Sequence, residues 1–247
     1  MRALLAAVQC DKSALTTNLA MHVRVLDEAA RAGCEFAVFP EMSLTGSVDP
    51  RSHPDDAIAI DDDAVATLAR ATDSGVAALF GIAERSGREF FITQIYAEGG
   101  RVVGAYRKRH LGEGEEGFTR GETPALFHLG EMPFGVTICA EGAVDYPFSE
   151  PAAAGARVVF FCAAPGLTGR RTDEAGLRAG FEWWESCGLA DAVRHARRCG
   201  VAVALTTQAG STRDEEFPGL AALVSPDGEV VARLPDWQPA TLVVEVG

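Results

Sequence analysis

Apolar positions follow two patterns along the chain, continuous runs typical of buried strands and a helical periodicity typical of amphipathic helices. Residues 2–9 and 36–39 are short, almost wholly apolar runs, which predict strands buried on both faces. Between these runs, apolar residues recur every three or four positions, so we expect a helix that Ser13 caps and Gly33 ends. Its predicted core-facing residues are Leu15, Leu19, Val23, Leu26 and Ala30.

The alternation continues to the end of the chain, but the middle is richer in strands. Helices are predicted over 61–72, which opens on three aspartates, over 147–154 and over about 173–199. The other apolar runs predict strands at 76–83, 90–97, 102–106, 126–129, 134–138, 157–161, 201–206, 221–224, 230–233 and 242–246. Since no Pro/Gly/Ser linker or repeat divides the sequence, we expect residues 1–247 to form one α/β domain. The strand-rich middle favours two packed sheets covered by helices.

Composition narrows the possible partners. The chain is 47% hydrophobic and 23% charged, which is typical of a soluble globular protein. Its net charge of -13, without a Lys/Arg stripe, argues against nucleic-acid binding. No run approaches the roughly 18 apolar residues of a membrane span. Six cysteines without a CxxC pair are expected to be reduced thiols, which favours a cytoplasmic location.

Four segments contain candidate chemistry. Cys139 ends the predicted strand Gly135–Ile138, at the end of a strand where α/β proteins commonly place reactive groups. Because free cysteine is often buried for packing alone, position leaves both roles open. Glu41 directly follows the strand 36–39 and a proline. Lys108 lies in the basic strand end 106–111, and a glycine-rich acidic loop, 112–118, follows it.

In this order and spacing, the segments FPE, YRKRHL, the acidic loop with its Phe-Thr-x-Gly end, and GVTICAE resemble the nitrilase, or carbon–nitrogen hydrolase, superfamily. Asp11 and Asn18 fit its amino-terminal pattern, and the segments 217–219 and 225–228 fit its closing hairpin. The resemblance implies a four-layer α-β-β-α sandwich and a homodimer. Two positions differ from the common family pattern. Ala140 stands where an aromatic residue is frequent, and Thr207-Gln208 stands where an asparagine is frequent.

The resemblance also implies a triad of Glu41, Lys108 and Cys139. In that triad the thiol of Cys139 attacks the substrate, the glutamate takes its proton, and the lysine charge stabilises the oxyanion. A second glutamate is expected to support the triad. We assign it to Glu116, eight residues after Lys108, with Glu113 and Glu115 as alternatives. No metal or organic cofactor is required.

We expect the substrate to contact Ala140, whose N–H is a natural second oxyanion donor, and also Glu141, His110 and Ala164. Two pairs of residues each have two possible roles. Trp183 and Trp184 are expected to pack in the core, with a place in the pocket wall as the alternative. Arg170 and Arg171 are expected to be solvated, with binding of a substrate carboxylate as the alternative.

The implied reaction is hydrolysis of a non-peptide C–N bond in a small linear amide, through a thioester and with release of ammonia. An N-carbamoyl amidohydrolase or a nitrilase is the alternative within the same chemistry. A catalytically silent binding protein on the same scaffold is the alternative from another class. A Cys–His peptidase, pairing Cys139 with His110 or His195, explains fewer of the residues.

Overall fold

Two six-stranded sheets form the centre of the computed structural model, which describes residues 1–167 and 173–247. The first sheet has the order β14-β1-β2-β3-β4-β5 and the second β13-β12-β9-β8-β7-β6. The strands of the first sheet are β1 (Arg2–Ala7), β2 (Phe36–Val38), β3 (Ala77–Ser86), β4 (Glu89–Glu98), β5 (Arg101–Arg107) and β14 (Ala240–Glu245). Those of the second are β6 (Phe127–Leu129), β7 (Met132–Ile138), β8 (Val158–Ala163), β9 (Ala202–Thr207), β12 (Ala221–Val224) and β13 (Val230–Arg233).

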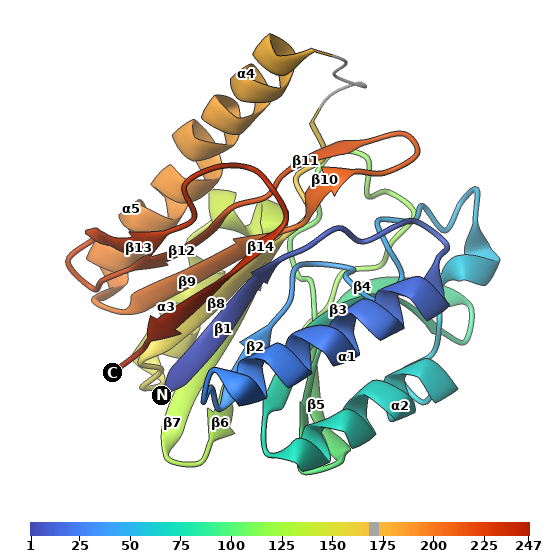
Figure 1. Cartoon of the computed structure of the whole chain (residues 1–247), viewed down its shortest axis with the longest axis horizontal. Helices are drawn as coiled ribbons and strands as arrows, with labels where there is room; N and C mark the ends of the chain where they lie inside the picture. Colours follow the sequence, from blue (N-terminus) through green and yellow to red (C-terminus); the bar gives the residue numbers. More distant parts are fainter. Residues whose placement is uncertain (168–172) are drawn as a thin grey trace.

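Helices cover the outer face of each sheet. Helices α1 (Leu15–Arg31) and α2 (Asp63–Ala71) lie on one side, and α3 (Tyr146–Ala153), α4 (Glu174–Trp184) and α5 (Ala190–Cys199) lie on the other (Figure 1). The two chain ends meet beside β1 and β14, where the amino terminus donates a 2.8 Å hydrogen bond to the carbonyl of Val246. The result is a helix–sheet–sheet–helix arrangement of four layers.

Three apolar layers hold these elements together. Aromatic rings fill the space between the sheets, where Phe134 lies 5.2 Å from both Phe36 and Tyr96, centroid to centroid. A second layer, which includes Leu68, joins the first sheet to α1 and α2, and a third, which includes Phe148, joins the second sheet to α3 and α5. Strand β1 contributes alternate residues to two of the layers, which explains why its sequence is apolar at every position from Ala3 to Ala7.

Most predicted elements are confirmed, with differences at helix α1. Asp62 caps α2 through a 2.8 Å bond from the amide of Ala64, as its three aspartates suggested. Ser13, in contrast, is not the cap of α1: it has a φ of +60°, and its hydroxyl donates to Asp56. As predicted, Leu26 is buried and Leu15 and Leu19 pack against the core, but Ala30 is exposed and polar side chains are also buried. The buried α1 residues are Asn18, His22, Val25, Leu26 and Ala29.

Two details of the carboxyl-terminal half differ from the prediction. The long helix expected over 173–199 is interrupted by a π-helical turn, Glu185–Leu189, between α4 and α5. A short hairpin of β10 (Ala209–Ser211) and β11 (Glu216–Pro218) lies between β9 and β12 and was not expected from the sequence. Both features lie near the cavity described below, whose wall includes Trp183, Trp184, Cys187, Gly188 and Glu215.

Candidate active site

Four strands end at the same edge of the paired sheets. Strands β2 and β3 are parallel, and two successive antiparallel pairings give β5 the same direction. In the second sheet, β7 and β8 are parallel. The residues that follow β2, β5, β7 and β8 therefore come together, and they include Glu41, Lys108, Cys139 and Ala164.

Cys139 begins a 3₁₀ turn, Cys139–Ala143, directly after β7. Its φ of +40° is a left-handed conformation that non-glycine residues rarely adopt. Such strain persists only where the surrounding structure fixes it, and it is frequent at functional sites. The tight turn stops the chain from continuing along the sheet, so the cysteine lines a cavity at the sheet edge.

Glu41 is held at three points. Its side chain is buried, and Oε2 accepts a 2.9 Å hydrogen bond from the amide of Ala164, which lies in the other sheet. Its backbone carbonyl accepts a 2.8 Å bond from Nε2 of Gln208. The preceding Phe39 carbonyl accepts a 3.1 Å bond from Nε2 of Gln94. Two buried glutamines therefore fix the backbone on both sides of Pro40.

Lys108 is fully buried after β5 and lies between two carboxylates. Its Nζ is 2.7 Å from Oε1 of Glu41 and 2.6 Å from Oε1 of Glu115. A buried ammonium is costly unless it is paired and hydrogen-bonded, and these two glutamates meet that requirement.

The glutamate beside Lys108 is Glu115, not the preferred Glu116. Glu115 turns back into its own loop, where Oε2 accepts a 2.7 Å bond from the amide of Gly112. Glu116 is exposed and lies 3.0 Å from the guanidinium of Arg51. The structure therefore places Glu115, one of the two alternatives, and not Glu116, in the position expected for the second glutamate.

Burial and mutual charge set the protonation of the cluster. Burial raises the pKa of the Cys139 thiol well above its ordinary value, the Glu41 carboxylate raises it further, and Lys108 opposes them. Burial also raises the pKa of Glu41, against the effect of Lys108. For Lys108, burial alone lowers the pKa, but the neighbouring anions reverse this and raise it overall. These shifts favour the neutral form of the thiol and the charged form of Lys108, and they raise the proton affinity of Glu41.

A cavity of about 800 Å³ opens onto this cluster. Glu41, Glu115 and Cys139 lie in its wall, together with apolar residues from several loops and the π-helical turn. The apolar residues of the wall include Met42, Val48, Phe118, Ala140, Ala143, Ala164, Pro165, Trp183 and Trp184. The arrangement of a thiol, a carboxylate base and a fixed cation at a partly apolar cavity suits nucleophilic attack on a small carbonyl compound.

The family model for carbon-nitrogen hydrolase matches residues 4–247. The chain belongs to the carbon–nitrogen hydrolase family. Solved structures of an amidase from Nesterenkonia sp. AN1, of the nitrilase superfamily, share the fold. A cysteine-to-alanine mutant of that amidase aligns with a TM-score of 0.80 and 22% identity over 99% of this chain and 89% of that one. The same amidase after His-tag removal aligns at 0.81 and 24% over 100% and 93%. The four-layer α-β-β-α sandwich is thus confirmed.

A third structure of the amidase, a glutamate-to-glutamine mutant, carries the acetamide moiety of fluoroacetamide on its active-site cysteine. It aligns with a TM-score of 0.80 and 22% identity over 99% of this chain and 89% of that one. A comparison with curated proteins gave no match.

The residues expected to contact substrate in this carbon–nitrogen hydrolase fall into two groups. Ala140 and Ala164 line the cavity, whereas Glu141 and His110 are not among its lining residues. Glu141 is fully buried and accepts four hydrogen bonds from protein groups, so its oxygens face the protein. The backbone amide of His110 is one of these donors.

The other candidates are placed as follows. Both Trp183 and Trp184 line the cavity, but Trp183 is about half exposed, whereas Trp184 is buried in the apolar core, as expected for a packing residue. His195 is buried and stacks on Phe148 at 4.0 Å, away from the cavity wall. Arg170 and Arg171 lie outside the described residues.

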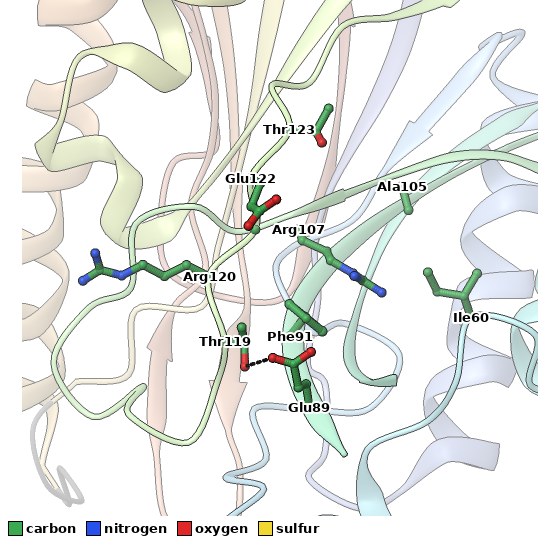
Figure 2. A pocket seen from close by; sticks show the side chains of 10 residues that line it. Ile60, Glu89, Phe91, Ala105, Arg107, Thr119, Arg120, Glu122 and Thr123 are labelled. Carbon is green, nitrogen blue, oxygen red and sulfur yellow. Dashed lines mark hydrogen bonds between the residues drawn. The ribbon is translucent and has the colours of Figure 1, made fainter. Parts of the chain in front are cut away.

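A second cavity, of about 510 Å³, lies where β4 and β5 meet the segment 119–123 (Figure 2). Arg107, next to Lys108 in sequence, lies in its wall, stacked 3.9 Å over the ring of Phe91 and paired with the buried Glu84. Its charge is thus already balanced, and the lining residues that the structure describes include no cysteine or histidine. This cavity has no reactive cluster comparable to that at Cys139.

Side-chain grouping and helix hydropathy bear on metal ions and membranes. Within residues 1–167 and 173–247, no three His, Cys, Asp or Glu side chains are grouped so that they could hold a metal ion. Among the helices of the same residues, none is both long and apolar enough to cross a bilayer.

Proposed function

We propose that the chain is an amidohydrolase that cleaves the C–N bond of a small linear amide through a thioester on Cys139 and releases ammonia. The observation that supports this most directly is the buried Lys108 ammonium, which is paired with Glu41 and Glu115, two carboxylates in the wall of the cavity that Cys139 also lines. A purely structural ion pair would not need to adjoin a strained cysteine.

The proposed acylation half-reaction follows from the geometry. Glu41 takes the thiol proton as Sγ of Cys139 bonds to the amide carbon. The ammonium of Lys108 and the backbone N–H of Ala140 stabilise the negative oxygen of the tetrahedral intermediate. The C–N bond then breaks, and the proton held by Glu41 passes to the departing nitrogen, which leaves as ammonia. Glu115 keeps the Lys108 ammonium oriented throughout.

The deacylation half-reaction uses the same groups. Glu41 takes a proton from water, and the water oxygen bonds to the thioester carbon. The C–S bond breaks, the carboxylic acid leaves, and Glu41 returns its proton to the sulfur. The raised pKa of Glu41 matches a group that must accept and return a proton in each half-reaction.

The relatives support amides over other C–N compounds. The Nesterenkonia amidase has been captured with butyramide in a cysteine-to-alanine mutant and with an acetamide moiety on its cysteine. At 22% identity this likeness supports the substrate class only, and N-carbamoyl compounds and nitriles are the other candidates. An N-carbamoyl substrate would release carbon dioxide together with ammonia, which distinguishes it from a carboxamide in one assay.

The test is ammonia release from a panel of aliphatic amides, ω-amides, nitriles and N-carbamoyl compounds. Cys139→Ala should abolish release, whereas Cys199→Ala, a half-buried thiol on α5 away from the cavity, should retain it. Mass spectrometry of the protein with substrate should detect an acyl adduct on Cys139. No activity across the panel and no adduct would support the catalytically silent binding protein, and an adduct on another cysteine would refute the site.

We further propose that residues 1–247 form one domain and that the protein is a cytoplasmic homodimer. The family match over residues 4–247 supports the first point. The dimer and the location remain predictions from the resemblance and the cysteine content. Sedimentation equilibrium would settle the dimer, since a single species of 26.1 kDa would contradict it.

A further inference from the structure

Glu141 is a buried carboxylate two residues after Cys139 that the proposed reaction does not use. Its side chain is fully buried, and both of its oxygens are occupied by protein donors. Oε2 accepts a 2.8 Å bond from the amide of Ile138. Oε1 accepts bonds of 2.7 Å from the Tyr106 hydroxyl, 2.7 Å from the Arg109 amide and 3.2 Å from the His110 amide.

These donors come from both sheets. Ile138 ends β7 in the second sheet, immediately before Cys139, so its bond to Glu141 closes the strained turn. Tyr106 lies in β5 of the first sheet, and Arg109 follows that strand. One carboxylate therefore joins the cysteine turn to the segment on both sides of Lys108.

The donor set requires a carboxylate. All four partners donate, so both oxygens must accept, and an ionised carboxylate offers only acceptor sites. An amide in the same place would direct its NH₂ group at the backbone N–H of Ile138 in one orientation, or at those of Arg109 and His110 in the other, leaving buried donors unpaired at a cost of about 1–3 kcal/mol each. The bonds also explain how the φ of +40° at Cys139 is maintained.

We propose that Glu141 is a positioning residue, which holds the Cys139 turn and the Lys108 segment in register and does not contact substrate. The expected change in kcat rests on the proposed function, because it presupposes that the protein hydrolyses an amide. A misplacement of about 1 Å between reacting groups can lower a rate about 100-fold. Because the cavity itself is formed by other residues, substrate affinity should change little when Glu141 is altered.

Two variants test this role. Glu141→Gln keeps the length of the side chain and replaces one acceptor, and Glu141→Asp keeps the charge and withdraws the carboxylate. Both should lower kcat, by about 100-fold for the glutamine and about 10-fold or more for the aspartate, with KM within about threefold of wild type. The matched control is Glu98→Gln, which alters a glutamate that accepts from the buried Tyr96 in β4 of the first sheet. It should retain wild-type kcat.

A second readout does not depend on amide hydrolysis. The rate at which iodoacetamide alkylates Cys139, followed by peptide mass spectrometry from pH 6 to pH 10, reports the thiol and its neighbouring cation directly. In Glu141→Asp the rate should fall, and its pH midpoint should rise, because Lys108 no longer lies where it favours the thiolate. Circular dichroism at each pH would confirm that the variants are folded. Should the glutamine variant not fold, the aspartate variant, which keeps the charge and all acceptors, supplies both readouts.

The outcomes distinguish the positioning role of Glu141 from the proposed amidohydrolase function. A raised KM with unchanged kcat would make Glu141 a substrate contact, and unchanged kcat, KM and alkylation would make the four bonds irrelevant to the site; either overturns the inference. A wild-type protein that hydrolyses nothing refutes the proposed function, while the alkylation profile still tests the positioning role.

Discussion

The backbone amide of Ala164 donates a 2.9 Å hydrogen bond to Oε2 of Glu41, across the boundary between the two sheets. Ala164 follows β8, and Glu41 follows β2, so the bond exists only when the sheets are packed. With Oε1 directed at Lys108 and Oε2 at this amide, the carboxylate has one orientation. The proposed base is thus fixed by the tertiary fold and not by its own loop. Single substitutions among its partners are therefore expected to change activity by displacing one defined group.

Glu115 and Glu116 give the sharpest comparison of neighbours. Glu115→Gln should lower kcat at least about 10-fold, because the Lys108 ammonium loses one of its two anionic partners and with it part of its fixed position. Glu116→Gln should stay within about twofold of wild type, because Glu116 is exposed and an exposed pair with Arg51 contributes little. Steady-state kinetics on the best amide of the panel would measure both. Equal losses, or a larger loss at Glu116, would contradict the placement.

The pH profile of kcat/KM should be asymmetric. Glu41 must be ionised to accept the thiol proton, so activity falls as the pH drops through its pKa, which burial raises above the ordinary glutamate value. Lys108 must be protonated, and the anions around it raise its pKa, so it causes no loss at moderately alkaline pH. The acid limb should therefore lie above the ordinary glutamate pKa of about 4.3. An acid limb at or below that value would argue against Glu41 as the base.

The resemblance to the carbon–nitrogen hydrolase superfamily was sufficient to assign three members of the cluster. Lys108 and Cys139 each directly follow a strand, and Glu41 follows β2 after two intervening residues, but a position at a strand end did not by itself separate a catalytic role from a structural one. The second glutamate could not be predicted, because neighbouring residues of a turn point in different directions. The available signal was Gly112, three residues before Glu115, whose amide is free to bond a returning carboxylate.

Long-range donors explain the other differences. Glu141 was expected in the pocket because it is close to Cys139 in sequence, but three of its four donors lie more than 30 residues earlier in the chain. The buried polar residues of α1 were missed for a similar reason. Asn18 bonds the carbonyls of Asp11 and Leu44, and apolar periodicity alone cannot detect a polar side chain that has such partners. The π-helical turn also leaves no clear trace in the apolar pattern.

The two adjacent tryptophans should separate binding from stability. Trp183 is 49% exposed at the cavity wall, so Trp183→Ala should raise KM about 10-fold through loss of an aromatic contact, with little change in kcat or Tm. Trp184 is 6% exposed and packs near Phe161, so Trp184→Ala should lower the free energy of unfolding by about 3–5 kcal/mol. Kinetics and urea unfolding of both variants provide the measurement. A KM unchanged in Trp183→Ala would remove it from the binding wall.

His22 should make stability depend on pH. It is buried between the Asn18 carbonyl and the Ser43 hydroxyl, and burial lowers its pKa from 6.5 to about 4. The unfolded chain therefore binds a proton between those values that the folded chain does not, so the stabilisation is complete above pH 6.5 and is lost as the pH falls towards 4. From pH 7.5 to pH 5 this amounts to about 2 kcal/mol.

Urea unfolding of His22→Gln measures this effect. Between pH 7.5 and pH 5 its free energy of unfolding should fall by about 2 kcal/mol less than that of wild type. His53→Gln, which alters an exposed histidine, should follow wild type. Parallel curves for wild type and His22→Gln would show that His22 is already protonated in the folded protein at pH 5.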